Sequence, residues 1–444
     1  MKKHKILPIA LAILVVLSAG CGDDATEPTR PEIPLTLIQR LEALEGCTVV
    51  EIDPPSGAHF ERAFQISMTQ PVDHNNPDGP TFTQRMFLSH YSESAPMVLV
   101  TWGYDVARNR SFELAEMLQA NQLYVAHRYH GDNKPDPFSW EDLNVEQAAG
   151  DHHRITELFK TIYTGPWVNY GISKGGRTAA LHRRFYPNDV LASVVVASPF
   201  FQYTHDLRID EFLSNTVGTE ACRDKIRALQ CLALSRRETL LPLYEDYIQE
   251  RGYSYTRVGG VEAAFEYDIL EYSYIFWQFY VDGECDLIPD STATDQELFE
   301  YLQRVSGVDF FRDEICDVIE CALYQFYTQL GYYGFVTDHL DTLLKVVGDD
   351  PSYEFMAPQT VPLNFDPTVM QDVVPWLETQ GNNMIYVYGG VDPGTGAALN
   401  PGSSTNSISI TQAGASHLVT INELSRRQEV LDSLYSWLGI PHTQ

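Results

Sequence analysis

Basic residues are scarce in this sequence. The 444-residue chain has 30 lysines and arginines against 60 aspartates and glutamates, which gives a formal net charge of −30 at pH 7. A surface this acidic repels the phosphates of nucleic acid, so we exclude DNA and RNA as partners. Hydrophobic residues make up 44% of the chain and charged residues 20%. These values are ordinary for a soluble globular enzyme, which is the class we expect.

Long apolar runs are missing after the first 20 residues, so we expect no transmembrane helix beyond them. Residues 1–20 begin with lysines and continue as an apolar run, Ile6–Leu17, which is typical of a signal peptide. The string Leu-Ser-Ala-Gly-Cys ending at Cys21 resembles a bacterial lipobox, in which Cys21 is acylated. The alternative is an ordinary signal peptide that contains a cysteine. We expect a lipid anchor at Cys21, a polar tether over 21–34 and an extracytoplasmic domain, in the periplasm or at the cell surface.

Cysteine is also rare, and its spacing is not that of a metal site. The chain has no CxxC pair and no cysteine–histidine cluster, so zinc is disfavoured and we expect neither a metal nor a cofactor. Besides Cys21, the cysteines are Cys47, Cys222, Cys231, Cys285, Cys316 and Cys321. An even number in an exported chain predicts disulfides. The short loops 222–231 and 316–321 are plausible pairs, but the sequence leaves the connectivity open.

Internal repeats are absent, and the pattern of apolar residues divides the chain into three parts. In residues 35–200, short strands alternate with helices, which predicts a mostly parallel sheet. Residues 201–355 lose the strand pattern and become helix-like, aromatic and acidic. The strand pattern returns in residues 356–444. We therefore predict an α/β core with a mostly parallel sheet, interrupted by a helical insertion. The expected strands are 64–68, 84–90, 97–101, 123–127, 167–172, 191–197, 382–388 and 407–411, and the expected core helices are 144–163, 175–185 and 422–438.

A glycine-rich turn follows the expected strand 167–172. Its sequence, Gly171-Ile172-Ser173-Lys174-Gly175, fits the G-x-S-x-G pattern, with a strand before it and a helix after it. A nucleophile elbow requires that context, because its glycines allow the sharp turn that exposes the serine. The alternative is a small residue in a glycine-rich loop, since the bare motif is weak evidence. The context favours Ser173 as a nucleophile and the backbone N–H of Lys174 as an oxyanion donor.

A serine nucleophile needs a base, and the base needs an orienting acid. In hydrolases built around such an elbow, the three residues follow one another along the chain in the order serine, acid, histidine. Asp392 follows a buried strand, and His417 lies 25 positions later in the small-residue loop Gly414-Ala415-Ser416-His417. Each has a structural alternative, a turn former before proline for Asp392 and a capping loop residue for His417. The ordered set predicts a Ser173–Asp392–His417 triad at the carboxyl edge of the sheet.

A second oxyanion donor usually comes from the loop after an earlier strand. Thr101-Trp102-Gly103-Tyr104 follows the expected strand 97–101. We therefore nominate the backbone N–H of Gly103 or of Tyr104. The alternative is a tight turn without a catalytic role.

Four stretches resemble one family of peptidases. They are HRYHGDNKP (127–135), SWEDLNVEQAAGDHHRI (139–155), IYTGPWVNYGISKGGRTAALHRRFYP (162–187) and EYSYIFWQFYVDGECDLIP (271–289). These stretches resemble the secreted bacterial prolyl tri- and tetrapeptidyl aminopeptidases, serine peptidases related to prolyl carboxypeptidase. The resemblance implies an α/β-hydrolase core with a helical cap, and cleavage of short peptides from free N-termini, often after proline. It also implies triad roles for Ser173, Asp392 and His417. Ala126 and Arg177 depart from the family pattern, where an acid and a methionine are usual, and both changes bear on substrate preference.

The segment 201–355 is acidic and rich in aromatic residues. It contains 30 acids and 11 bases, a charge that attracts the cationic N-terminus of a peptide. Its aromatic rings would pack well on proline, although the core of the segment itself needs such rings. We select Trp277 and Arg177 as candidate substrate contacts. Glu271 and Glu266 are candidate ligands of the substrate amine, and the alternative for each is a solvated helix acid.

The sequence therefore predicts a lipid-anchored serine exopeptidase of the tripeptidyl-peptidase type. Its expected partners are peptides with a free N-terminus, together with the membrane that holds the lipid. One alternative is an esterase or lipase on the same fold, which the acid-rich cap disfavours. Another is a peptide-binding lipoprotein that keeps the fold without catalysis. The number of residues removed per cut, the proline dependence and the oligomeric state are left open by the sequence.

Overall fold

The computed structural model describes residues 35–279, 282–348 and 350–441. The expected signal peptide, Cys21 and the whole tether over 21–34 lie outside the described residues. Residues Leu37–Gln444 make one compact unit, and the fold below is that of this unit. Among the helices of the described ranges, none combines the length and apolar character needed to cross a membrane.

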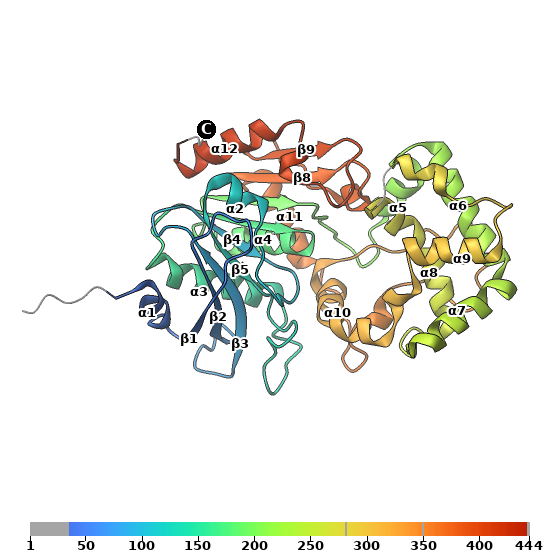
Figure 1. The fold of residues 1–444 in the computed structure, drawn as a ribbon, viewed down its shortest axis with the longest axis horizontal. Coiled ribbons are helices and arrows are strands. Elements are labelled where there is room, and N and C mark those ends of the chain that lie inside the picture. Colours follow the sequence, from blue (N-terminus) through green and yellow to red (C-terminus); the bar gives the residue numbers. More distant parts are fainter. Residues whose placement is uncertain (1–34, 280–281, 349, 442–444) are drawn as a thin grey trace, which may run out of the picture. The chain divides into compact units, whose positions relative to one another are not determined.

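Nine strands in the described ranges form one sheet in the order β1-β2-β3-β5-β4-β6-β7-β8-β9 (Figure 1). Neighbouring strands are antiparallel from β1 to β5 and parallel from β5 to β9. This is the strand order of the α/β-hydrolase fold with one extra strand at its start, and it confirms the predicted fold class. The bounds are β1 Cys47–Ile52, β2 Arg62–Pro71, β3 Thr81–His90, β4 Met97–Thr101, β5 Asn121–Val125, β6 Trp167–Ile172, β7 Ala192–Val196, β8 Met384–Gly389 and β9 Ile408–Gln412.

Alternation along the strands explains why helices cover both faces of the sheet. In β4, Val98 and Val100 pack in one apolar cluster with α2 and α12, whereas Met97 and Leu99 pack in another with α1 and α3. Successive strand residues point to opposite faces, so a strand that is apolar throughout must be covered on both sides. The core helices are α1 Leu37–Glu42, α2 Glu113–Leu118, α3 Val145–Lys160, α4 Lys174–Phe185, α11 Thr368–Thr379 and α12 Arg427–Leu438.

The described residues between β7 and β8 contain helices and no strand. We call residues 201–355 the insertion. Its long central helix, α8, is buried on nearly every side, as expected of a helix surrounded by α6, α7 and α9. Figure 1 shows these four helices grouped together beside the sheet. The α-helices are α5 Leu207–Glu211, α6 Glu220–Ser235, α7 Arg237–Arg251, α8 Val261–Phe279, α9 Asp295–Val305 and α10 Asp313–Gln325, and a π-helix, η4 Phe326–Leu330, continues α10.

One disulfide, Cys222–Cys285, joins α6 to the 3-10 helix η2 (Asp282–Leu287), with a Cα–Cα distance of 5.5 Å. Both short-loop pairs suggested by the sequence are therefore wrong. Each pair lies on a single helix, α6 for 222–231 and α10 for 316–321. At about 1.5 Å per residue, the helix holds both pairs beyond the roughly 7 Å that a disulfide can bridge. Cys47, Cys231, Cys316 and Cys321 are free thiols.

Candidate active site

Ser173 occupies a strained turn between β6 and α4. Its φ is 56° and its ψ is −127°, a backbone conformation that residues other than glycine rarely adopt. The approach of strand and helix is so close that a Cβ at Gly171 would lie 2.1 Å from the carbonyl oxygen of Gly175. Only glycine fits there, and the serine is left at the tip of the turn. The elbow predicted from the sequence is present.

The loops after β8 and β9 bring Asp392 and His417 together. The Nδ1 atom of His417 lies 2.8 Å from Oδ2 of Asp392, and the other carboxylate oxygen accepts a bond from the Gly394 N–H. Asp392 is fully buried. Burial lowers the pKa of His417. The charge of Asp392 and its hydrogen bond to the imidazole raise that pKa by more than burial lowers it, so the pKa of His417 lies above its usual value. The carboxylate thus favours the protonated imidazole.

Ser173 and His417 line one cavity of about 450 Å³. The core contributes these two residues with Tyr104 and Arg177, and the insertion contributes most of the remaining wall. His417 is tied to the insertion as well, because its backbone N–H donates to the carbonyl oxygen of Gln278 at 3.0 Å. The helix α8 therefore helps to position the loop that carries the histidine. The main wall residues from the insertion are Glu271, Tyr274, Phe310, Phe326, Tyr332 and Tyr333.

The nominated oxyanion loop lies directly against the elbow. A Cβ at Gly103 would come within 2.6 Å of the Cβ of Lys174. The Lys174 ammonium is buried and donates to the Gly103 carbonyl at 2.8 Å and to Gln325 Oε1 at 2.7 Å. Burial, reinforced by the charge of Arg177, holds its pKa well below the usual value. In a trans peptide the C=O and N–H point in opposite directions, so this bond turns the Tyr104 N–H away from the ammonium.

Glu271 lies in the cavity wall, as its selection as a substrate ligand requires. Its carboxyl accepts hydrogen bonds from the hydroxyls of Tyr333, at 2.9 Å, and of Tyr353. Burial raises its pKa to about 8, although the two tyrosine hydrogen bonds act in the opposite direction. Much of this carboxyl is therefore protonated at neutral pH in the empty cavity, and it stays available to a group that stabilises its ionised form.

Glu266 and Trp277 do not line this cavity. The buried carboxylate of Glu266 pairs with Arg237 and accepts backbone N–H bonds from residues 345–347, so it ties α8 to another part of the insertion. Trp277 is buried in the insertion and lines a different cavity, with Leu213 and His339. The two positions lie on the same helix as Glu271, and the sequence did not distinguish the face that meets the serine.

Several residues at this site were not selected from the sequence. Phe326, Tyr332 and Tyr333, from η4 and the chain that follows, line the cavity, and Gln325, at the end of α10, accepts a hydrogen bond from the Lys174 ammonium. They carry no motif, and they reach the site only because this segment packs against the elbow. The large number of aromatic residues in segment 201–355 indicated that some of them could contact substrate, but it did not indicate which positions would do so.

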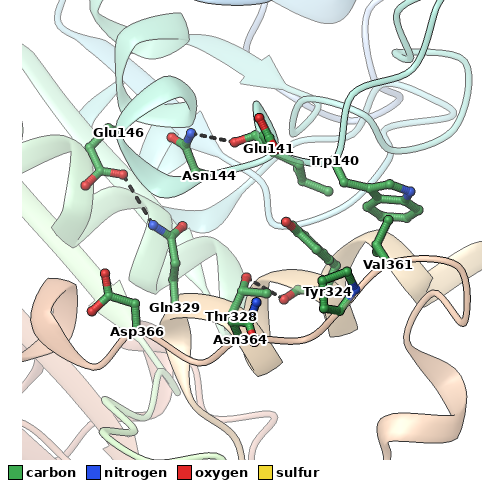
Figure 2. Close-up of a pocket in the computed structure, with 12 residues that line it drawn as sticks. Trp140, Glu141, Asn144, Glu146, Tyr324, Thr328, Gln329, Val361, Asn364 and Asp366 are labelled. Atoms are coloured by element: carbon green, nitrogen blue, oxygen red, sulfur yellow. Dashed lines mark hydrogen bonds between the residues drawn. The ribbon is translucent and has the colours of Figure 1, made fainter.

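A second cavity, of about 400 Å³, lies on another side of η4 (Figure 2). Thr328 and Gln329 of η4 line it with Trp140, Asn144 and Asp366, whereas Phe326 lines the cavity of Ser173. Gln329 links it to the core, because its Oε1 accepts a bond from the Val145 N–H at 3.0 Å. Neither Ser173 nor His417 lines this second cavity, so we place the chemistry in the first.

An α/β-hydrolase sheet with a strained serine and a histidine held by a buried aspartate defines the class of serine hydrolases. The chain belongs to the PS-10 peptidase S37 family, whose model matches residues 31–442. It is therefore a serine peptidase.

Individual relatives agree with the family. A prolyl tri/tetrapeptidyl aminopeptidase from Streptomyces mobaraensis is 31% identical over 98% of this chain and 92% of its own length. A lysosomal Pro-X carboxypeptidase from Mus musculus is 28% identical over 40% of each chain. Among solved structures, a proline iminopeptidase from Mycobacterium smegmatis aligns with a TM-score of 0.40 and 13% identity, over 84% of this chain and 98% of that one.

Proposed function

We propose that this protein is a serine exopeptidase that releases tri- or tetrapeptides from free N-termini, with a preference for cleavage after proline. The observation that carries the proposal is the near full-length similarity to a prolyl tri/tetrapeptidyl aminopeptidase. The cavity supports it, because the serine and the histidine open into a space whose wall is formed largely by the insertion. Such a wall leaves room for the end of a peptide more readily than for the middle of a folded chain.

The proposed chemistry uses Ser173, His417 and Asp392 as a triad. His417 removes the proton from the Ser173 hydroxyl as its oxygen attacks the carbonyl carbon of the proline, and a tetrahedral intermediate forms. The imidazolium then gives its proton to the leaving amine as the C–N bond breaks, and the acyl-enzyme remains. Water, deprotonated by His417, attacks the ester carbonyl. The ester C–O bond breaks, the imidazolium returns its proton to Ser173 Oγ, and the short peptide leaves with a new carboxylate. Asp392 holds the imidazole tautomer and stabilises its charged form.

The proposed oxyanion hole consists of the backbone N–H groups of Lys174 and Tyr104. The first belongs to the opening turn of α4, where N–H groups have no partner within the helix. The second is oriented by the bond between the Lys174 ammonium and the Gly103 carbonyl. Each donor of this kind contributes about 3 kcal/mol to lowering the barrier.

Glu271 is the proposed ligand of the substrate amine. A peptide α-amino group has a pKa near 8, close to that of Glu271, so binding places a proton between two groups of similar affinity for it. Ionisation of the carboxyl then gives a buried ion pair, assisted by the hydroxyls of Tyr333 and Tyr353. Acetylation of the amine removes this partner.

The proposed domain division is a core of residues 35–200 and 356–444 around the cap 201–355. The proposed location is extracytoplasmic, with a lipid on Cys21 that anchors the protein to a bacterial membrane. The disulfide Cys222–Cys285 supports export, because such bonds persist in oxidising compartments. Metabolic labelling with a clickable fatty acid tests the anchor. We expect label on the wild-type protein and none on Cys21→Ser.

The decisive test uses Ser173→Ala and two substrates, Ala-Ala-Pro p-nitroanilide and its N-acetyl derivative. We expect the wild-type protein to release p-nitroaniline from the free-amine substrate alone, and Ser173→Ala to lose at least about 10⁴-fold in kcat. A fluorophosphonate probe should label the wild type and spare the variant. Faster cleavage of a simple ester than of the peptide would favour an esterase instead. Absence of both labelling and turnover would favour a binding protein.

A further inference from the structure

Arg177 places a positive charge in the wall of the catalytic cavity. It lies four positions after Ser173 on α4, about one helical turn, and it lines the same cavity. Only 3% of the residue is exposed. The guanidinium packs against two aromatic rings, with its carbon 5.2 Å from the centroid of Phe201 and 4.7 Å from that of Phe326. A buried cation next to the reacting serine needs a reason.

The hydrogen bonds of Arg177 are incomplete. Its Nη1 atom makes only two long contacts, 3.4 Å each, with the carbonyl oxygens of Leu330 and Gly331. Its buried Nε has no partner among the described residues. A guanidinium carries five N–H donors in a planar fork. Most of that capacity has no acceptor among the described residues.

No carboxylate within the described ranges lies closer than 4.0 Å to Arg177. Glu271 shares the cavity, but its carboxyl is engaged by the hydroxyls of Tyr333 and Tyr353. Two other deeply buried arginines are neutralised, Arg128 by Asp151 at 2.7 Å and Arg237 by Glu266. Burying a charge without a counter-charge is costly, and burial lowers the pKa of Arg177 to about 10. Arg177 therefore lacks the anion that its environment requires.

We propose that Arg177 is a carboxylate-binding subsite of the catalytic cavity, so that the peptidase prefers peptides that bring a negative charge near the cleaved bond. This inference rests on the proposed function and adds a substrate class to it. A carboxylate accepts two parallel hydrogen bonds from the guanidinium fork and also neutralises its charge. A neutral amide supplies no such counter-charge. With Glu271 as the amine ligand, the cavity would hold both ends of a zwitterionic peptide.

The carboxylate can come from two sources. One is an acidic side chain in the released peptide, at either of the two positions before the proline. The other is the C-terminal carboxylate of a very short substrate. The first is tested with p-nitroanilides of Ala-Glu-Pro and Ala-Gln-Pro and of Glu-Ala-Pro and Gln-Ala-Pro. The second is tested by mass spectrometry with Ala-Ala-Pro-Ala and its C-terminal amide. Ala-Ala-Pro p-nitroanilide is the neutral reference.

We expect the wild-type protein to cleave the acidic member of at least one pair with a kcat/KM about tenfold above that of its neutral partner. Arg177→Met should bring that ratio to one or below, and Arg177→Lys should keep part of it. The matched control is Arg183→Met on the same helix. Arg183 is also buried and binds the carbonyls of Val190 and Asn382, but it does not line the cavity. Its substitution should leave the ratio as in the wild type.

The result that overturns the inference is a wild-type ratio within about twofold of one in all three pairs, or a ratio that Arg177→Met leaves unchanged. Neither criterion depends on the absolute activity of a variant, and the first needs only the wild-type protein. If even the neutral reference is not cleaved, the proposed function fails separately. Calorimetric titration of Ser173→Ala with the same acidic and neutral peptides then decides the inference, because equal affinity within each pair rejects it and tighter binding of an acidic member supports it.

Discussion

The core and the insertion contribute to the same cavity in different ways. The core supplies Ser173 and His417, with Asp392 buried behind the histidine, from turns and loops at strand ends, where the register of parallel strands fixes their positions. The insertion supplies Glu271, Phe326, Tyr333 and neighbouring residues, whose positions depend on how its helices pack. The comparison teaches that the proposed triad and the proposed recognition surface are encoded differently. The first follows from local chain geometry, whereas the second is assembled from segments that share no motif.

The largest effect is expected in the core. Asp392→Asn keeps the shape of the side chain but removes the charge that raises the pKa of His417, so the imidazole loses its preferred tautomer. We expect kcat to fall about 10⁴-fold. In the wild type, His417 must be neutral to accept a proton, so kcat/KM should decline as pH falls through the raised pKa. A pH profile of the variant with that decline unmoved would contradict the role of Asp392.

Glu271→Gln tests the recognition side of the comparison. The amide cannot ionise beside the substrate amine, so we expect KM for Ala-Ala-Pro p-nitroanilide to rise by roughly 10- to 100-fold with a smaller change in kcat. The matched control is Glu266→Gln on the same helix, which loses contacts to Arg237 and to backbone amides but does not line the cavity. It should lower the melting temperature and leave KM nearly unchanged. Equal KM effects in the two variants would refute our distinction between them.

Gln325→Leu tests whether the insertion also acts on the reaction. Its side-chain oxygen holds the Lys174 ammonium, which in turn orients the Gly103–Tyr104 peptide. We expect kcat to fall about tenfold while KM changes little, because an oxyanion donor acts mainly in the transition state. The separate variant Gln325→Glu keeps an acceptor oxygen at this position and should keep most of the wild-type activity. The control Gln329→Leu, in the second cavity of Figure 2, should change kcat less than twofold.

The last prediction concerns stability rather than activity. Burial raises the pKa of Glu271 to about 8 and that of Asp268 to about 7, so the folded protein holds protons that the unfolded chain releases above about pH 4.5. The contribution of these two groups to the free energy of unfolding should therefore decrease as pH rises from about 4.5 to 8, by roughly 7 kcal/mol for the two together. Urea denaturation of the wild type and Glu271→Gln measures this. The variant should lose less stability over that range, and parallel curves would show that Glu271 does not titrate in it.

Much of the core could be predicted because its signals are local. The expected strands 97–101 and 167–172 coincide with β4 and β6, since a short apolar run between turns has few other folded states. The elbow was predictable because Gly171 and its neighbours are required by the turn itself. The insertion was less predictable. Glu266 and Glu271 look alike in the sequence, and only the packing of α8 places one against Arg237 and the other in the cavity.

By itself, the sequence determined the alternation of strands and helices, the elbow at Ser173, and the chain order that brings Asp392 and His417 to the same edge of the sheet. These follow from periodicity and steric limits that act over a few residues. Only the tertiary structure decided that Cys222 pairs with Cys285, that Gln325 reaches Lys174, and that Arg177 is buried without a carboxylate partner among the described residues. Those outcomes depend on contacts between segments that are distant in the chain, and no local pattern specifies which of them meet.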